Sequence, residues 1–316
     1  MSEYTAPIAD MEFVLRHISD LERVSQLNGF QHAEPDTAVG VLAEAGRFFS
    51  EVIAPTNWIG DQVGSVLNDD GSVTTPEGFK EAYRKFVDAG WPGVHLPEMA
   101  GGGGFPYAVG IALQEMFTSA NMAFSLAPLL TQGAIDALIE HGSEEQQATY
   151  LEKLATGEWT GTMCLTETHS GSDLGTISTK AVEQDDGTYR ITGQKIYITW
   201  GEHDLTENII HLVLANTPDA APGTRGISMF IVPKFIPDAE GNPGERNDVK
   251  VVSIEHKMGI NASPTCVLAF GDEGGAVGYL VGEAQRGMKY MFTMMNSARI
   301  GVAVEGLAIG EMAYQR

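Results

Sequence analysis

A run of small and polar residues at the end of an apolar segment is the first place where this sequence could do chemistry. The run Met163–Asp173 reads MCLTETHSGSD, so an apolar stretch passes into a turn rich in Ser, Thr and Gly. Such a turn exposes successive backbone N–H groups and hydroxyls toward one side, which suits the rim of an isoalloxazine ring or a pyrophosphate. An ordinary surface turn has the same composition, so turn chemistry alone leaves both interpretations open.

A second candidate segment, Thr192–Gly201, reads TGQKIYITWG. If residues 195–199 form a strand, Tyr197 and Thr199 lie on the same face by alternation. An aromatic platform and a hydroxyl two residues apart could meet a flat ring and its N5 atom. On spacing alone, a Tyr/Thr face inside an ordinary core is the favoured interpretation.

Two other motifs fail on their spacing. The run Gly101–Gly104 suggests a phosphate loop, but no Gly-Lys-Ser/Thr follows and Pro106 stands where GxGxxG needs its last glycine. We therefore favour a flexible turn between helices. A nucleophile elbow at Ser170 would need Gly two residues earlier, where Thr168 stands, so a hydrolase is rejected despite the nearby His169.

Composition narrows the function classes. Lys and Arg total 19 against 42 Asp and Glu, for a net charge of −23. Such a surface repels phosphate backbones and anionic membranes, so neither nucleic acid nor a membrane is an expected partner. A phosphate-bearing cofactor would have to be held by local cations or backbone N–H groups.

Segments for export, for crossing a membrane or for binding a metal are not expected. No apolar run approaches about 20 residues, and the acidic N-terminus does not resemble a secretory signal, which predicts a cytoplasmic protein. Cys164 and Cys266 form no CxxC pair, and the eight histidines show no HxxxH or HExxH spacing. We predict no metal site and no redox dithiol.

Helical periodicity dominates the first half of the chain. We predict helices that begin at Asp36 and end at Pro55, that begin at Thr75-Pro76 and close at Gly90, that span Tyr107–Phe124 and Thr131–Gly142, and that start at a capping box of Ser143 and Gln146.

Alternation typical of strands begins near Gly157 and gives way to helical periodicity near Gly287. The predicted strands cover residues 160–166, 178–183, 188–192, 195–199, 209–215, 226–232, 249–254, 266–270 and 277–281, with a hairpin turn at 185–187 and loops at 216–225 and 237–247. The final stretch predicts one long helix whose apolar face cannot be buried alone, so more chain or another chain is expected to pack on it.

This order of elements predicts the α+β class, with helices and strands segregated along the chain. The predicted parts are an N-terminal extension at 1–34, a helical domain at 35–158, a middle antiparallel β domain at 159–284, and the first helix of an incomplete C-terminal helical domain at 285–316.

At several landmarks the sequence resembles the acyl-CoA dehydrogenase family. They are Leu165-Thr166-Glu167 with Gly171-Ser172-Asp173, Gly193-Gln194-Lys195 with Ile198-Thr199, Lys257-Met258-Gly259, Gly282-Glu283, and Met295-Asn296-Ser297-Ala298-Arg299, in the family's order. The N-terminal extension, Glu255–Gly259 and Phe292–Asn296 are most similar to a subgroup with a longer chain. That subgroup includes the 3-methylmercaptopropionyl-CoA dehydrogenases.

The resemblance implies the family fold, with FAD between the β domain and a C-terminal helix bundle. It also implies a homodimer or homotetramer in which a neighbouring subunit holds part of the cofactor. By position, the implied cofactor-binding residues are Met163, Leu165, Thr166, Gly171, Ser172, Tyr197 and Thr199, and the implied substrate-binding residues are Ser172, Asn296 and Arg299. Thr168 and Ser170 replace the family's usual Pro and Ala, so the turn between them is expected to sit differently.

The implied reaction is the FAD-dependent α,β-dehydrogenation of an acyl-CoA thioester to the enoyl-CoA, with 3-methylmercaptopropionyl-CoA as the candidate substrate and electron-transfer flavoprotein as the acceptor. The base is implied to be a Glu, and Ala298 occupies one family position for it. Glu305 and Glu311 match neither family position, so we expect no catalytic residue in this chain and a base beyond Arg316. An acyl-CoA oxidase and a non-catalytic flavin-binding subunit of a heteromer are the alternatives.

Overall fold

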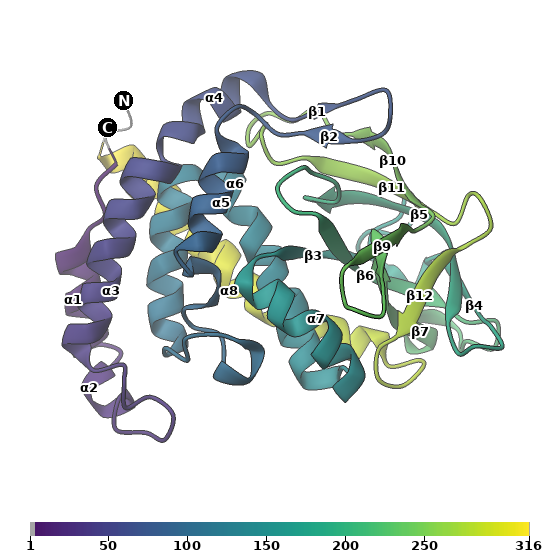
Figure 1. The fold of residues 1–316 in the computed structure, drawn as a ribbon, viewed down its shortest axis with the longest axis horizontal. Helices are drawn as coiled ribbons and strands as arrows, with labels where there is room; N and C mark the ends of the chain where they lie inside the picture. Colours follow the sequence, from purple (N-terminus) through teal and green to yellow (C-terminus); the bar gives the residue numbers. More distant parts are fainter. Residues whose placement is uncertain (1–3, 316) are drawn as a thin grey trace.

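Helices form one side of the computed structural model, which describes residues 4–315, and strands form the other side (Figure 1). The helices of the first half are α1 (Ile8–His17), α2 (Leu21–Val24), α3 (Pro35–Phe48), α4 (Pro55–Val63), α5 (Phe79–Asp88), α6 (Tyr107–His141) and α7 (Glu144–Thr156). The α+β class and the separation of helices from strands are thereby confirmed.

Three helix boundaries differ from the prediction. Asp36 does not cap a helix, since α3 already begins at Pro35. Pro55 does not stop the chain: a π-helix at Phe49–Ile53 joins α3 to α4, and Pro55 takes the first position of α4, where its missing N–H costs nothing. Thr75 binds Asp204 instead of capping α5, which begins at Phe79.

The helix α6 is the largest departure, because the predicted pair 107–124 and 131–142 forms one element of 35 residues. Its backbone leaves helical geometry at Asn121, with φ −160°. The Asn121 side chain accepts from the N–H of Phe124 at 3.1 Å and donates to Thr56 at 2.8 Å. This amide acts as an internal N-cap, so the chain resumes its helix immediately.

By length and composition α6 could cross a membrane, which the absence of a long apolar run in the prediction did not anticipate. Here it is a core helix, with 56% of its most apolar window buried. Its main neighbours are the final helix and the first strand of the large sheet.

An eight-stranded sheet forms most of the second half, in the order β10-β11-β5-β12-β7-β6-β3, with β4 bonded to β5 and β6. Its strands are β3 (Trp159–Cys164), β4 (Lys180–Glu183), β5 (Tyr189–Thr199), β6 (Asn208–Asn216), β7 (Ile227–Pro233), β10 (Val249–Ile254), β11 (Thr265–Phe270) and β12 (Ala276–Leu280). Short ribbons pair β1 (Val66–Leu67) with β2 (Val73–Thr74) and β8 (Phe235–Pro237) with β9 (Pro243–Arg246).

The β domain departs from the prediction in three ways. It is not wholly antiparallel, since β3 runs parallel to β6 over six residue pairs. The predicted strands 188–192 and 195–199 are one strand, β5, and the predicted loop 237–247 contains β9. The hairpin turn at 185–187 is confirmed by the antiparallel pairing of β4 with β5.

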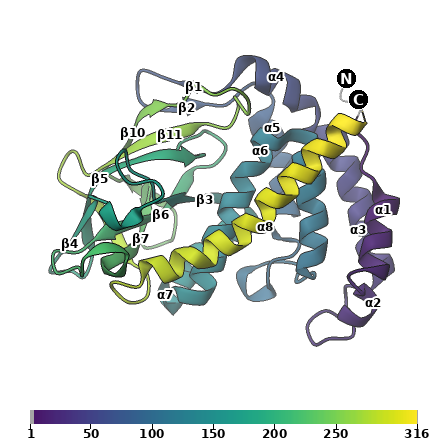
Figure 2. The ribbon, with the colours of Figure 1, turned by 180° about the vertical axis from the view of Figure 1, so that it is seen from behind.

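The helix α8 (Gly287–Tyr314) runs diagonally from the sheet across α6 to the far end of the helical side (Figure 2). Met291 and Met294 are buried among side chains of α6 and the sheet. At its other end, the Gln315 amide bonds the backbone N–H and C=O of Thr5 at 2.9 and 2.8 Å. Through α8 the helical and β parts are therefore held together.

Candidate functional site

The end of β3 lies against β5, as both candidate segments require. The carbonyl of Thr166 accepts from the N–H of Ile196 at 2.9 Å. Met163 and Leu165 are half-buried beside the apolar cluster that also includes Met295 of α8. Met163 and Leu165 therefore pack against an apolar cluster that the sheet, α6 and α8 share, and Thr166 lies against β5.

A buried carboxylate fastens the turn after β3 to the sheet. Glu167 accepts from the N–H and hydroxyl of Ser178, both at 2.7 Å, and from the N–H and hydroxyl of Thr179 at 3.0 and 2.6 Å. Lys195 on β5 donates to the same carboxylate at 2.9 Å and to the carbonyl of Leu165 at 3.0 Å. We call Glu167, Ser178, Thr179 and Lys195 the carboxylate clamp.

Both charged groups of the clamp are enclosed, with 2% of the Glu167 side chain and none of the Lys195 side chain exposed. Burial alone would raise the pKa of Glu167, but the Lys195 charge and the hydrogen bonds outweigh it and lower that pKa to about 2. The carboxylate is therefore ionised at neutral pH and balances the buried ammonium.

This pKa predicts an acid-labile contribution to stability. Because the folded pKa of about 2 lies below the ordinary 4.5, the contribution is complete above pH 4.5 and disappears as the pH falls toward 2. It amounts to at most about 3 kcal/mol. Acid unfolding of the wild type and Glu167→Gln, followed by tryptophan fluorescence, should show stability curves that converge as the pH falls from 4.5 to 2. Parallel curves through that window would contradict the assignment.

The turn that the clamp holds is itself ordered and exposed at its tip. Glu167 and Ser170 exchange two backbone hydrogen bonds at 3.0 Å, and the Ser170 hydroxyl donates to the carbonyl of Asp173 at 2.6 Å. Gly171 and Ser172 are exposed, and no atom lies within 4 Å of where a Cβ of Gly171 would stand. A bound group can therefore approach the backbone at this tip.

On β5, the predicted alternation is interrupted just before the two candidate residues. The pairing with β11 shifts between Lys195 and Ile198, and Tyr197 has a φ of +59°. Lys195 and Ile198 are both buried although they are three residues apart, which is the effect of a β-bulge. Tyr197 is 60% exposed and Thr199 is half-buried, so Tyr197 is not part of the core.

Two predicted substrate residues meet on the exposed side of α8. Asn296 and Arg299 are both exposed, and Arg299 donates to the side-chain oxygen of Asn296 at 2.7 Å. The guanidinium also lies 5.5 Å from the ring centre of Phe292. This turn of α8 presents a fixed cation on the surface of a strongly acidic chain.

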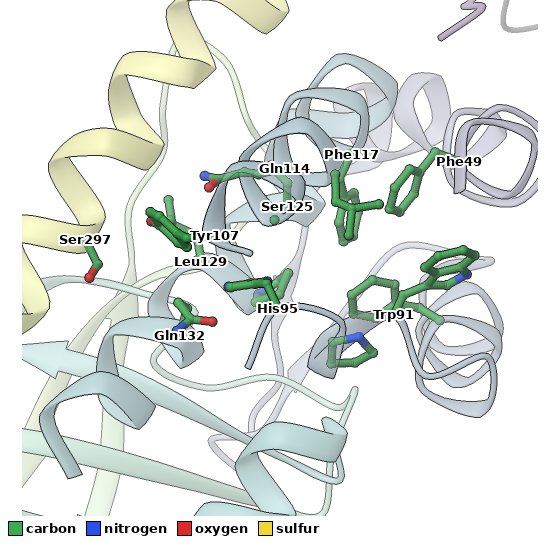
Figure 3. Close-up of a pocket in the computed structure, with 15 residues that line it drawn as sticks. Phe49, Trp91, His95, Tyr107, Gln114, Phe117, Ser125, Leu129, Gln132 and Ser297 are labelled. Atoms are coloured by element: carbon green, nitrogen blue, oxygen red, sulfur yellow. The ribbon is translucent and has the colours of Figure 1, made fainter. Parts of the chain in front are cut away.

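A cavity opens between α6, α8 and the residues before α6 (Figure 3). The centres of water-sized molecules can occupy a volume of about 70 Å³ in this cavity. That volume holds several waters. Its aromatic end is formed by Phe49, Phe86, Trp91 and Phe117, and its polar end by His95, Tyr107, Gln114, Gln132 and Ser297.

The polar end contains a chain of hydrogen bonds from α8 to the cavity. Ser297 donates to Asp136 at 2.6 Å, and Gln132 donates to the other oxygen of Asp136 at 2.7 Å. Burial lowers the pKa of His95, which favours the neutral imidazole. Burial likewise raises the pKa of Asp136.

The clamp and the polar end of the cavity are absent from the residues proposed from the sequence. Glu167 and Lys195 stand inside the quoted motifs, but their pairing joins positions 28 residues apart. Gln114, Gln132 and Asp136 are polar residues within the apolar helix α6. That contrast is the signal that could have indicated them.

Family models match most of the chain. Residues 41–158 match a model described as the acyl-CoA dehydrogenase N-terminal domain, and residues 162–272 match the middle domain of the same family. Over 99% of this chain and 52% of the relative, the sequence is 52% identical to 3-methylmercaptopropionyl-CoA dehydrogenase of Ruegeria pomeroyi. The chain thus spans about half the length of the curated relatives it matches.

Solved structures share the fold. The butyryl-CoA dehydrogenase of Megasphaera elsdenii superposes with a TM-score of 0.71 at 26% identity, over 87% of this chain and 66% of that one. An acyl-CoA dehydrogenase from Bacillus anthracis, solved in complex with FAD, has a TM-score of 0.61 at 28% identity, over 73% of this chain and 37% of that one.

Proposed function

The chain belongs to the acyl-CoA dehydrogenase family, and from that premise we propose that its protein oxidises an acyl-CoA thioester to the enoyl-CoA with FAD. The observation that carries the proposal is the meeting of the end of β3, with its clamped turn, and β5, the two segments that carry the family motifs. A separate cavity between α6 and α8 offers space for an acyl group. FAD, when bound, accepts the hydride that leaves the β carbon as the α proton is removed.

Residues at the two strand ends fit a flavin. Met163, Leu165 and Thr166 offer a half-buried edge between apolar and polar surroundings. Gly171 leaves its backbone open to a bound group, and Tyr197 presents a free aromatic face. We propose that these residues, with Ser172 and Thr199, hold the cofactor, while the carboxylate clamp keeps the turn in place.

The CoA part of the substrate carries phosphates, which the net charge of −23 would repel. Arg299, positioned by its bond to Asn296, offers a local cation on α8. We propose that Asn296, Arg299 and Ser172 bind the CoA part, and that the acyl group enters the cavity past Ser297.

The proton at the α carbon requires a carboxylate base. Glu305 is buried, burial raises its pKa, and one of its oxygens has no partner among residues 4–315. Neither Glu305 nor Glu311 lines the cavity between α6 and α8. We therefore keep the proposal that the base is a Glu outside this chain.

The substrate proposal is 3-methylmercaptopropionyl-CoA, the acyl-CoA named for the Ruegeria relative. The confined cavity between α6 and α8 supports a short acyl group. Electron-transfer flavoprotein as acceptor, a homodimer or homotetramer, and a cytoplasmic location complete the proposal on the strength of the family resemblance.

The test is the absorption spectrum of the purified full-length protein before and after 3-methylmercaptopropionyl-CoA is added without an electron acceptor. We expect a flavin band that bleaches on addition and stays bleached in air, because a dehydrogenase passes its electrons to a protein acceptor. Bleaching followed by fast recovery in air would indicate an oxidase. A flavin band that no acyl-CoA bleaches would contradict the proposed function.

A further inference from the structure

Three side chains that line the cavity between α6 and α8 leave a buried nitrogen unpaired among residues 4–315: Trp91 at the aromatic end, and His95 and Gln114 at the polar end. Nε2 of His95 and Nε2 of Gln114 are buried and have no partner among residues 4–315. A buried nitrogen left unpaired costs stability, so such atoms in a cavity indicate a bound group that pairs with them. In Figure 3 the His95 and Gln114 side chains lie nearer the aromatic end of the cavity than Ser297 does.

Glycines in both helices make room for these side chains. A Cβ at Gly110 of α6 would lie 2.4 Å from Cγ of the His95 ring. A Cβ at Gly301 of α8 would lie 2.6 Å from Nε2 of Gln114. Glycine inside a helix is about 0.5–1 kcal/mol less favourable than alanine. The space that Gly110 and Gly301 leave for His95 and Gln114 therefore costs helix stability.

The polar end of the cavity is also fixed by hydrogen bonds between the two helices. Gln132 of α6 donates to Asp136, which also accepts from Ser297 of α8. The His95 ring is neutral, so it adds polarity to the cavity without adding a charge. We call His95 and Gln114 the polar collar.

A hydrocarbon chain passing the polar collar would leave both nitrogens unpaired. An ether or thioether atom at that depth would accept from the Gln114 amide, and beyond it the aromatic end formed by Phe49, Phe86 and Phe117 would take a small apolar tip. We propose that the polar collar makes this protein select short acyl groups that carry an ether-type oxygen or sulfur within the chain. This inference rests on the proposed function and identifies the residues that determine its specificity.

Three acyl-CoA esters of nearly equal shape test the inference. The acyl chains differ only at the position after the β carbon. This position is oxygen in 3-methoxypropionyl-CoA, sulfur in 3-methylmercaptopropionyl-CoA and CH₂ in pentanoyl-CoA. For the full-length protein we expect kcat/KM for the two heteroatom esters to exceed that for pentanoyl-CoA by roughly tenfold, since a site built to hydrogen-bond penalises an analogue that lacks the acceptor.

Gln114→Leu keeps the bulk of the side chain and removes the donor. We expect the ratio of kcat/KM for a heteroatom ester to kcat/KM for pentanoyl-CoA to fall from roughly ten to about one, because kcat/KM for the heteroatom esters decreases. Pentanoyl-CoA should still bleach the flavin. Gln62→Leu, at an exposed glutamine on α4, is the matched control and should keep the wild-type ratio. If Gln114→Leu loses its flavin, Gln114→Met, which also removes the donor and keeps the bulk of the side chain, replaces it in the comparison.

The outcomes separate this inference from the proposed function. Equal kcat/KM values for all three esters in the wild type, or an unchanged ratio in Gln114→Leu, would overturn the inference and leave the dehydrogenase proposal standing. Failure of all three esters, and of longer acyl-CoAs, to bleach the flavin would instead overturn the proposed function.

Discussion

Replacing Glu167 with Gln is expected to lower the free energy of unfolding by about 3–5 kcal/mol. The substitution preserves shape but leaves the Lys195 ammonium, none of which is exposed, without its counter-charge. It also turns an amide N–H₂ toward a site where five donors now converge on two oxygens. The buried charge and the unpaired donors both contribute to the loss.

The same change should weaken flavin retention, because Glu167 holds the turn that carries Gly171 and Ser172. Urea unfolding of the full-length protein and its ratio of flavin to protein absorbance measure the two effects. Glu81→Gln, which breaks an exposed ion pair with Arg84, is the control and should change neither quantity. A Glu167→Gln protein as stable as the control would mean that the clamp does not stabilise the fold.

Local signals in the sequence predicted those elements whose causes are local. The capping box of Ser143 and Gln146 starts α7 as expected, since both bonds form within four residues. The turn at 185–187 joins β4 and β5 for the same kind of reason. The predicted boundaries were wrong where a residue distant in the sequence forms a hydrogen bond. The Asn121 amide inside α6 donates to Thr56, and the Thr75 hydroxyl donates to Asp204.

The residues of the candidate site also divide into those that one segment of sequence indicates and those that depend on distant contacts. Motif resemblance indicated Thr166, Ser172 and Thr199, because such residues stand at strand ends and turns that are visible in one segment. The β-bulge before Tyr197 depends on pairing with β11, so alternation along one strand could not predict it. The polar collar joins a residue before α6 to one within it, and its shape depends on Gly301, about 190 positions after Gln114 in the chain; no short pattern contains that contact.

One glycine joins the two halves of the molecule, and adding a single methyl group there tests how closely they are fitted. Gly161 lies on β3, where its N–H donates to the Thr131 hydroxyl of α6 at 3.0 Å. A Cβ at this position would lie 2.5 Å from Cβ of Ala134, well inside the roughly 3.5–4.0 Å of a carbon–carbon contact. Gly161→Ala must therefore push α6 away from the strand that leads to Met163 and Leu165.

We expect Gly161→Ala to lower the free energy of unfolding by about 1–3 kcal/mol through overpacking, and to reduce flavin retention because the end of β3 moves with the strand. Gly40→Ala is the matched control: no atom lies within 4 Å of its added Cβ in α3, so helix propensity should stabilise it by up to about 1 kcal/mol. The same chemical change thus has opposite expected signs in urea unfolding. If Gly161→Ala were also stabilising, ordinary strand propensity would outweigh the contact. The tight approach of α6 to β3 would then not be what aligns the helical half with the proposed flavin edge.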